Sequence, residues 1–252
     1  MDQNITIPTE IIDLPSKGLI YPAENPLSSG KIEMKYMTAK EEDILTNQSY
    51  IQKGTVLDKL LQALIVSKIN YNDLIVGDKN AIMVAARILG YGKDYSFEYD
   101  GQNYTIDLSD VDNKPFDELK LISKGVNEFN FTLPSSGLNI TYKLLTHGDE
   151  QKIQNELEGL KRLGMNNSPE LSTRLKYIIT SVNGDRDNKT IRQFVDTALL
   201  ARDSRDLRNH ISNNQPDVDL TFFPDSTSNK INIPIGLRFF WPDLWFSSRI
   251  QN

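Results

Sequence analysis

Few residues in this chain are suited to covalent or metal chemistry. The sequence has no cysteine and only two histidines, His147 and His210, which lie far apart along the chain. This excludes thiol catalysis, disulfides and cysteine zinc sites, and it argues against a metal site built on several histidines. No Gly-x-Ser-x-Gly, His-Glu-x-x-His or complete calcium-loop pattern occurs. We therefore expect no catalytic residues, no metal and no other cofactor.

The acidic residues that could act in pairs have a simpler structural explanation. Glu41-Glu42-Asp43 follows Thr38, in the first turn of an expected helix, where negative charge is favourable. His210 follows Asp206 by four positions and would share a helix face with it, but no nucleophile accompanies the pair. These groups are expected to cap helices or to face solvent, and the chain is expected not to be an enzyme.

The charge balance argues against nucleic acid as a partner. With 28 Lys and Arg against 34 Asp and Glu, the net charge is −6, whereas a general nucleic-acid binder needs a positive face. A basic ridge at a spacing of three residues interleaves with two aspartates: Arg202, Asp203, Arg205, Asp206 and Arg208. A mixed ridge of this kind is typical of a face that meets solvent or a protein partner.

No segment of the sequence suggests a membrane protein. No apolar run approaches the roughly 20 residues that a spanning helix needs. The first eight residues, Met-Asp-Gln-Asn-Ile-Thr-Ile-Pro, lack the basic and apolar regions of a secretory signal. We expect a soluble, cytosolic protein without a membrane span.

Two stretches of the chain show the same order of local signals. Leu14-Pro15-Ser16-Lys17-Gly18 and Leu133-Pro134-Ser135-Ser136-Gly137 both predict tight turns, because proline fixes φ and glycine accepts positive φ. Alternating residues follow in 31–36 and 139–145 and predict strands. The turn, strand and helix start recur in the same order, so we expect an internal duplication.

A helix start follows each of these strands. Thr38 with Glu41, and Thr146 with Asp149, have the spacing of a capping box, in which the hydroxyl and the acid satisfy opposite main-chain groups. The shorter Asp149 should form the weaker box. Further helix starts are expected at Asp78 and Asp187, at matching places in the two copies.

These signals predict an α+β fold with helices, short antiparallel strands and hairpins, duplicated as a strand–helices–hairpin unit. Helices are expected near 55–68 and 169–182 among others, and hairpins over 95–108 and 218–235. The expected organisation is an N-terminal arm (1–10), a first unit (11–108), a connector (109–127), a second unit (128–235) and an aromatic tail (236–252).

The aromatic tail is the densest apolar segment. Its large side chains are Phe239, Phe240, Trp241, Trp245 and Phe246. Three interpretations remain open: packing onto the same chain, an anchor for a partner subunit, and a weaker one, an anchor at a membrane interface. If the tail is an interface, Trp241→Ala should weaken partner binding by about 2 kcal/mol or more.

Several segments, in this order, resemble the baseplate-hub assembly proteins of T-even-type tailed bacteriophages. They are Leu14–Gly18, Met37–Leu45, Asp73–Asp78, Arg87–Gly92 and Phe239–Pro242. The resemblance covers most of the chain and is strongest over 11–108 and 231–243. It implies a hub component or hub-assembly factor that carries no catalytic residues.

The resemblance also bears on metals and location. Some family members have cysteine pairs at hairpin tips, which suggests a metal site there. This chain has Phe97 and Tyr104, and Phe222 and Ser228, at the matching positions, so no zinc is expected. The family implies a location in the host cytoplasm during assembly, or in the tail baseplate of the virion.

The sequence leaves three functional hypotheses. The first is a structural or assembly protein that binds other hub and tail subunits through the aromatic tail and a strand edge such as Ile32–Tyr36. The second is a transient chaperone of tail assembly that is absent from the finished virion. The third is a lytic hydrolase of the hub, which would need an acidic pair, and Glu41 and Glu150 are the residues to test.

Overall fold

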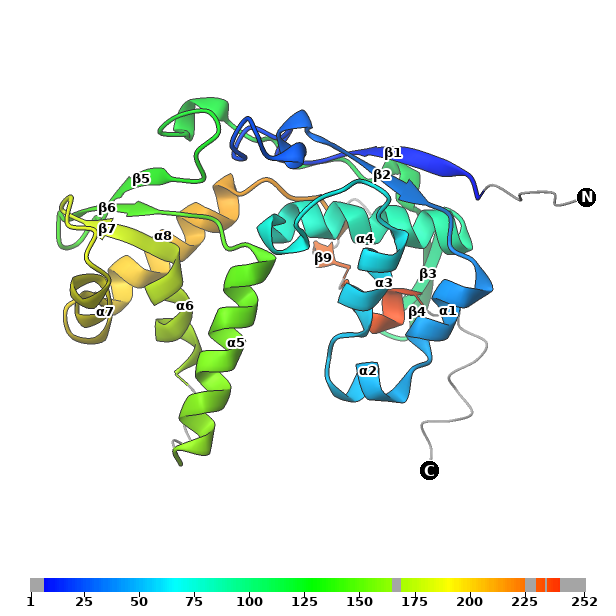
Figure 1. The fold of residues 1–252 in the computed structure, drawn as a ribbon. Helices are drawn as coiled ribbons and strands as arrows, with labels where there is room; N and C mark the ends of the chain where they lie inside the picture. The colour runs from blue at the N-terminus through cyan, green and yellow to red at the C-terminus, as the bar shows by residue number, and fades with distance from the viewer. Residues whose placement is uncertain (1–6, 165–168, 225–229, 234, 241–252) are drawn as a thin grey trace, which may run out of the picture.

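The computed structural model describes residues 7–164, 169–224, 230–233 and 235–240. It confirms the α+β class, with eight α-helices and four small antiparallel sheets in the described part of the chain. Two lobes lie side by side, one built mainly from the first half of the chain and the other mainly from the second (Figure 1). None of the described helices has the length and apolar character needed to cross a bilayer.

The first half builds one lobe from a hairpin, four helices and a second hairpin. Its elements in order are β1 (Thr9–Asp13), β2 (Lys31–Lys35), α1 (Ala39–Leu45), α2 (Gln48–Gln52), α3 (Val56–Leu64), α4 (Val76–Tyr91), β3 (Asp94–Tyr99) and β4 (Gln102–Asp107). Strand β1 pairs antiparallel with β2, and β3 with β4. Strand β1 begins at Thr9, within the expected N-terminal arm (1–10), and residues 1–6 lie outside the described part.

The second half forms the other lobe, except for its last hairpin, β8–β9, which lies against the first lobe beside β3 and β4 (Figure 1). Its elements are β5 (Phe129–Thr132), β6 (Asn139–Tyr142), α5 (His147–Arg162), α6 (Glu170–Ile178), β7 (Ile179–Val182), α7 (Asn188–Thr197), α8 (Ala201–Asn214), β8 (Thr221–Phe222) and β9 (Ile231–Asn232). Strands β5, β6 and β7 form one three-stranded antiparallel sheet, with β6 in the centre. The expected hairpin near 218–235 is present as the β8–β9 pair.

Two expected helices end earlier than the sequence periodicity suggests. Helix α6 stops at Ile178, and the chain continues as β7, which pairs with β6. Helix α3 likewise stops at Leu64, and Ile65 pairs with Met34 of β2. Both exits begin with β-branched residues, which favour extended backbone and fill the pleated surface of a sheet. Each half thus has a central strand that is paired on both sides.

The two Leu-Pro-Ser turns are fixed by the same kind of contact. In the first half, the main-chain N–H and the hydroxyl of Ser16 both donate to Asp78, at 2.9 and 2.7 Å. In the second half, the main-chain N–H groups of Ser135 and Ser136 donate to Asp203, at 2.7 and 3.0 Å. Asp78 and Asp203 occupy the third position of α4 and α8, respectively.

This contact corrects the expected match between the halves. The sequence pairs Asp78 with Asp187, but Asp187 caps α7 by accepting the N–H of Thr190 at 2.9 Å and does not meet the turn. The counterpart of Asp78 is Asp203, and α7 is an additional helix of the second half. Asp187 and Asp203 both lie at the start of a helix, so their local signals are alike. The spacing along the chain therefore matched Asp78 with the wrong aspartate.

The hydrophobic core is one continuous cluster that draws residues from both halves. The hairpins of the two halves meet in it: the ring centroid of Phe222 lies 5.5 Å from that of Phe97 and 5.2 Å from that of Tyr104. The positions at which the resembling family suggests cysteines therefore carry packed aromatic rings in this chain, apart from Ser228, which lies outside the described residues. The two halves therefore share one core.

Candidate functional site

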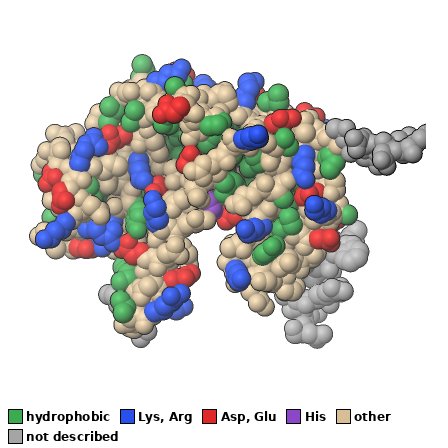
Figure 2. Space-filling view, viewed as in Figure 1, with side chains coloured by type: hydrophobic (Ala, Val, Ile, Leu, Met, Phe, Trp, Pro, Cys, Tyr) green, Lys and Arg blue, Asp and Glu red, His purple; other side chains and the backbone are tan. Residues whose placement is uncertain are grey.

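A cleft of about 770 Å³ opens between the two lobes. Figure 2 shows the surface hollowed at this place, between α5 on one side and the α2–α3 region on the other. The α5 wall presents one stripe of side chains, and the facing wall comes from α3, α4 and the loop before α3. The main polar lining residues are Lys53, Thr55, Asp58, Lys79, Asn80, Glu150, Gln151, Gln154, Asn155 and Glu158.

The two walls of the cleft differ in charge. The α5 wall carries Glu150 and Glu158, and the facing wall carries Lys53 and Lys79 together with Asp58. Lys79 forms an ion pair with Asp58 at 2.5 Å, whereas Lys53 has no ion pair within the described residues. The cleft therefore presents an acidic stripe of two glutamates opposite a wall that carries ammonium groups. Each glutamate has an arginine partner, Arg174 at 2.7 Å from Glu150 and Arg162 at 3.7 Å from Glu158.

Buried and half-buried polar side chains join the lobes beside this cleft. Asp58 accepts hydrogen bonds from the Tyr71 hydroxyl at 3.0 Å and from Lys79. The ring of His147 packs edge-on against Tyr71, with centroids 4.7 Å apart, and its Nδ1 lies 3.8 Å from the Asp58 carboxylate. The amide of Gln151 contacts the His147 Nε2 at 2.9 Å. Each member of this Asp58–Tyr71–His147 cluster is held by another, so the cluster links α3 to the start of α5.

The protonation of this cluster favours a structural role. Burial lowers the pKa of His147, and although Asp58 opposes that shift, Lys79 adds to it. Burial also raises the pKa of Tyr71, and its hydrogen bond to the Asp58 carboxylate raises it further. At neutral pH a neutral imidazole and a neutral phenol therefore lie beside a carboxylate already paired with lysine. No group here is positioned as a nucleophile with an adjacent base.

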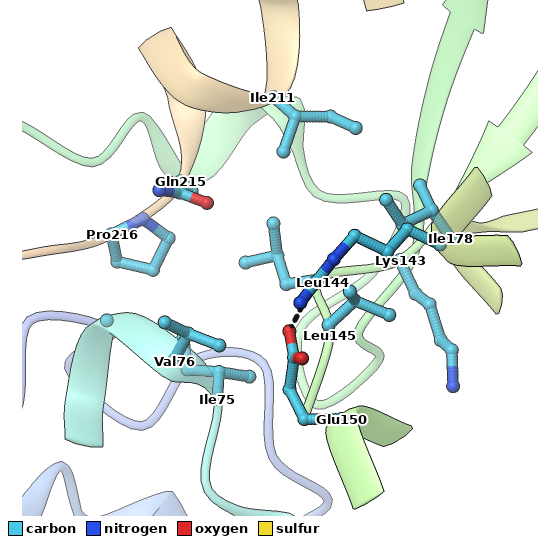
Figure 3. A pocket seen from close by; sticks show the side chains of 12 residues that line it. Ile75, Val76, Lys143, Leu144, Leu145, Glu150, Ile178, Ile211, Gln215 and Pro216 are labelled. Carbon is cyan, nitrogen blue, oxygen red and sulfur yellow. Dashed lines mark hydrogen bonds and ion pairs between the residues drawn. The ribbon is translucent and has the colours of Figure 1, made fainter. Parts of the chain in front are cut away.

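A second, smaller pocket of about 200 Å³ lies on the other side of Val76 and Glu150, which line both hollows. Apolar side chains from both halves enclose it, among them Leu144, Ile178 and Ile211 (Figure 3). Glu150 forms an ion pair of 2.7 Å with Arg174, marked by the dashed line in the figure. Its volume suits one apolar side chain with a polar neighbour, which is the shape of an anchor pocket for a partner.

The acidic residues considered for a hydrolase are not brought together. Glu41 is buried in the first half and pairs with Lys35 at 2.8 Å, whereas Glu150 pairs with Arg174 in the second half. Burial acts to raise the pKa of Glu41, but hydrogen bonds from Lys35 and Thr38 outweigh it and hold the pKa at about 2. Each carboxylate is ion-paired with a basic side chain of its own half, and the two do not form an acid–base pair.

Both expected capping boxes are present, and their side-chain hydrogen bonds differ from each other. The Thr146 hydroxyl accepts the Asp149 N–H at 3.2 Å, and Asp149 accepts the Thr146 N–H at 3.2 Å, so this box is reciprocal. In the first half, Glu41 accepts both the N–H and the hydroxyl of Thr38, at 3.1 and 2.5 Å, and the hydroxyl therefore acts as donor. Lysines at equivalent places, Lys35 and Lys143, reach these acids in both halves. These caps organise helix starts and are not part of the cleft chemistry.

The expectation that the tail residues are partner anchors needs correction for two of them. Phe239 and Phe240 lie in the 3₁₀ helix Leu237–Phe240 and are 1% and 0% exposed, respectively. The ring of Phe239 lies 4.9 Å from that of Tyr95, so both residues belong to the core of the chain itself. Packing onto the same chain was the alternative interpretation and describes these two residues. Trp241, Trp245 and Phe246 lie outside the described residues.

The other chemically suggestive residues have separate places. His210 packs 4.4 Å from the Phe131 ring, away from the cleft, and burial lowers its pKa. In the α8 ridge, Arg202 and Arg205 are exposed while Asp203 points inward to the turn. No group of three or more histidines or acids that could hold a metal ion exists among the described residues.

Sequence reasoning missed the two buried aspartates and the cluster at the lobe junction. Asp78 and Asp203 each occupy the third position of a helix. From the sequence, that position indicates only that an acid is favourable there, and not that it binds a distant turn. His147 follows Thr146 and lies in the first turn of α5, but its partners Asp58 and Tyr71 come from the other half. Only the tertiary fold brings them together.

The chain was compared with protein-family models, with curated proteins and with solved structures, and no match was found in any of the three comparisons.

Proposed function

We propose that this chain is a non-enzymatic tail protein of a bacteriophage, a component of the baseplate hub or a factor that assembles it, and that it acts by binding other hub and tail subunits. The location that follows is the host cytoplasm during assembly, or the tail baseplate of the virion. The order of the resembling segments in the sequence supports the viral assignment.

The cleft between the lobes is the observation that carries the binding role. Sites for small molecules are mostly apolar and enclosed. This cleft is wide, is lined mostly by charged and amide side chains, and adjoins a small apolar pocket. A polar segment of a partner protein with one apolar side chain fits both features. The acidic α5 stripe favours a segment with basic residues on the side that meets α5.

The segments that resemble the phage family include several interior residues. Ser16 and Asp78 fix the first turn, and Phe239 and Phe240 close the core. The resemblance therefore supports a shared framework for the first half. Partner recognition falls to exposed residues, of which the cleft walls form the largest connected set described above.

Quantitative mass spectrometry of purified particles of the source phage tests this proposal. The copy number is calibrated against a hub subunit of known stoichiometry. A few copies per particle would support a structural component. A background signal in particles, with abundant protein in infected cells bound to a hub precursor, would support an assembly chaperone. Absence from particles and from every complex of tail proteins would overturn the proposal.

A further inference from the structure

The outer edge of β1 has no strand partner among the residues that the structure describes. The N–H of Leu14 donates to Gly30 at 2.8 Å and that of Tyr36 donates to Pro8 at 3.1 Å, which sets the hydrogen-bonded positions of the β1–β2 ladder. Alternation then turns the main-chain groups of Thr9, Ile11 and Asp13 away from β2. No hydrogen bond within the described residues uses these outward groups. Figure 1 places β1 at the margin of the molecule, with β2 on its inner side.

The second half shows that the equivalent edge is covered. Strand β5 precedes the second Leu-Pro-Ser turn as β1 precedes the first. The outer edge of β5 pairs with the connector, through the Leu121–Phe129 bridge and a hydrogen bond of 3.2 Å from the Ile122 N–H to the Glu128 carbonyl oxygen. On β1, by contrast, Ile11 is 66% exposed. Exposed apolar edge strands are templates for pairing with another chain.

The expectation that the edge of Ile32–Tyr36 contacts a partner is not met. Strand β2 lies between β1 and the segment after α3, because Val66 donates to Glu33 O at 2.9 Å and Ile65 bridges Met34. The available edge of this sheet belongs to β1.

We propose that β1 pairs antiparallel with β1 of a second copy of this chain, with Ile11 on the twofold axis. All three outward residues are then used, since Thr9 faces Asp13 of the other copy and Ile11 faces Ile11. This register forms about six main-chain hydrogen bonds, and any shift of the strands loses some of them. The two small sheets become one four-stranded sheet.

The side chains of this register are complementary to themselves. The Ile11 side chains of the two copies contact each other, which removes the most exposed apolar side chain of β1 from water. The Thr9 hydroxyl faces the carboxylate of Asp13, which already holds Lys31 at 3.1 Å. Glu10, which accepts the Tyr36 hydroxyl at 3.1 Å, lies on the opposite face and is offset from its equivalent. No like charges face each other directly, so a second copy suits this edge.

A single cysteine tests the register, because the natural chain contains none. In a hydrogen-bonded antiparallel pair the Cα atoms lie about 5.5 Å apart, within disulfide range. Ile11→Cys should therefore oxidise to a disulfide-linked dimer. Leu163→Cys, at an 81% exposed residue on the tip of the other lobe, is the control and should oxidise much more slowly.

The oligomeric state of the unmodified chain gives the second measurement. Sedimentation velocity up to about 1 mM protein should show a reversible dimer. Ile11→Lys, which places two ammonium groups on the axis, should lower the association constant at least about tenfold, and Leu163→Lys should leave it unchanged. A monomer throughout, with the Ile11→Cys chain oxidising no faster than the control, overturns the proposal. A dimer that is insensitive to Ile11→Lys overturns it as well. Neither result depends on the proposed role in a phage tail.

Discussion

Asp78 and Asp203 hold equivalent turns in the two halves, yet their hydrogen-bond partners differ in kind. Asp78 receives one main-chain N–H and the hydroxyls of Ser16 and Tyr21. Asp203 receives two main-chain N–H groups. A hydroxyl can reverse its role and accept a hydrogen bond, whereas a main-chain N–H only donates. The two carboxylates therefore differ in how well an amide can replace them.

Replacing each aspartate by asparagine tests this difference. In Asp78→Asn the new NH₂ group can donate to the Ser16 and Tyr21 hydroxyls, and the free energy of unfolding should fall by less than about 1 kcal/mol. In Asp203→Asn the new NH₂ group faces a main-chain N–H, and two donors cannot form a hydrogen bond. The free energy of unfolding should therefore fall by about 1–3 kcal/mol. Urea unfolding at pH 7 measures both, with Asp206→Asn as the control on the same helix. Equal losses at the two sites would contradict the argument.

Glu41 makes stability depend on pH. Its pKa in the folded chain is about 2, below the usual value of 4.5, so the native state favours the ionised form. The stabilisation is complete above the unfolded-state value and is lost as the pH falls through 4.5 toward 2. We expect Glu41→Gln to cost about 2 kcal/mol at pH 7 and far less at about pH 2.5.

Urea midpoints at the two pH values measure the Glu41 effect. Glu24→Gln, at an exposed residue of the loop before β2, serves as the control and should change the free energy of unfolding by less than about 0.5 kcal/mol at either pH. A cost for Glu41→Gln that stays constant with pH would show that the Lys35 and Thr38 contacts do not hold the carboxylate ionised.

At the scale of elements, the sequence predicts the features that depend on neighbouring residues. The turns, the hairpins and the caps at Thr38 and Thr146 depend on residues within a few positions of each other, and the structure contains them. The strand β7 was missed because Ile178 and Ile179 suit a helix face and a buried strand equally well. The match of Asp78 with Asp203, and the Asp58–Tyr71–His147 cluster, depend on long-range packing that periodicity does not report.

The 3₁₀ helix Leu237–Phe240 is the element whose role changed most between sequence and structure. Since Phe239 and Phe240 are core residues, Phe239→Ala should lower the free energy of unfolding by about 3–5 kcal/mol. Phe223→Ala, at a 60% exposed residue after β8, should change it by less than about 0.5 kcal/mol. Thermal and urea unfolding measure both. A Phe239→Ala chain of unchanged stability would make this residue an interface candidate again.

At the scale of the whole molecule, the chain forms two lobes with one shared core and a cleft between them. The core and the Asp58–Tyr71–His147 cluster fix the lobes to each other. Helix α5 is hydrogen-bonded to the first half at its N-terminal end, through the His147 N–H to Leu74 O bond of 2.7 Å, and its remaining length forms one wall of the cleft. A partner segment would therefore enter a cleft whose shape is largely set before binding, which reduces the entropy lost on association.

The cleft can be tested without disturbing the fold. Gln154 is exposed on the α5 wall, and Gln154→Arg adds bulk and positive charge where the stripe is acidic. We expect the variant to unfold like the unmodified chain but to bind hub precursors at least about tenfold more weakly, because a basic partner segment would meet an added like charge. Gln193→Arg, the same substitution on the exposed face of α7 outside the cleft, is the matched control and should bind normally. Co-purification from infected cells, quantified by mass spectrometry, compares the two variants. Equal recovery of tail proteins with both would move the binding surface away from the cleft, toward other exposed faces of the lobes.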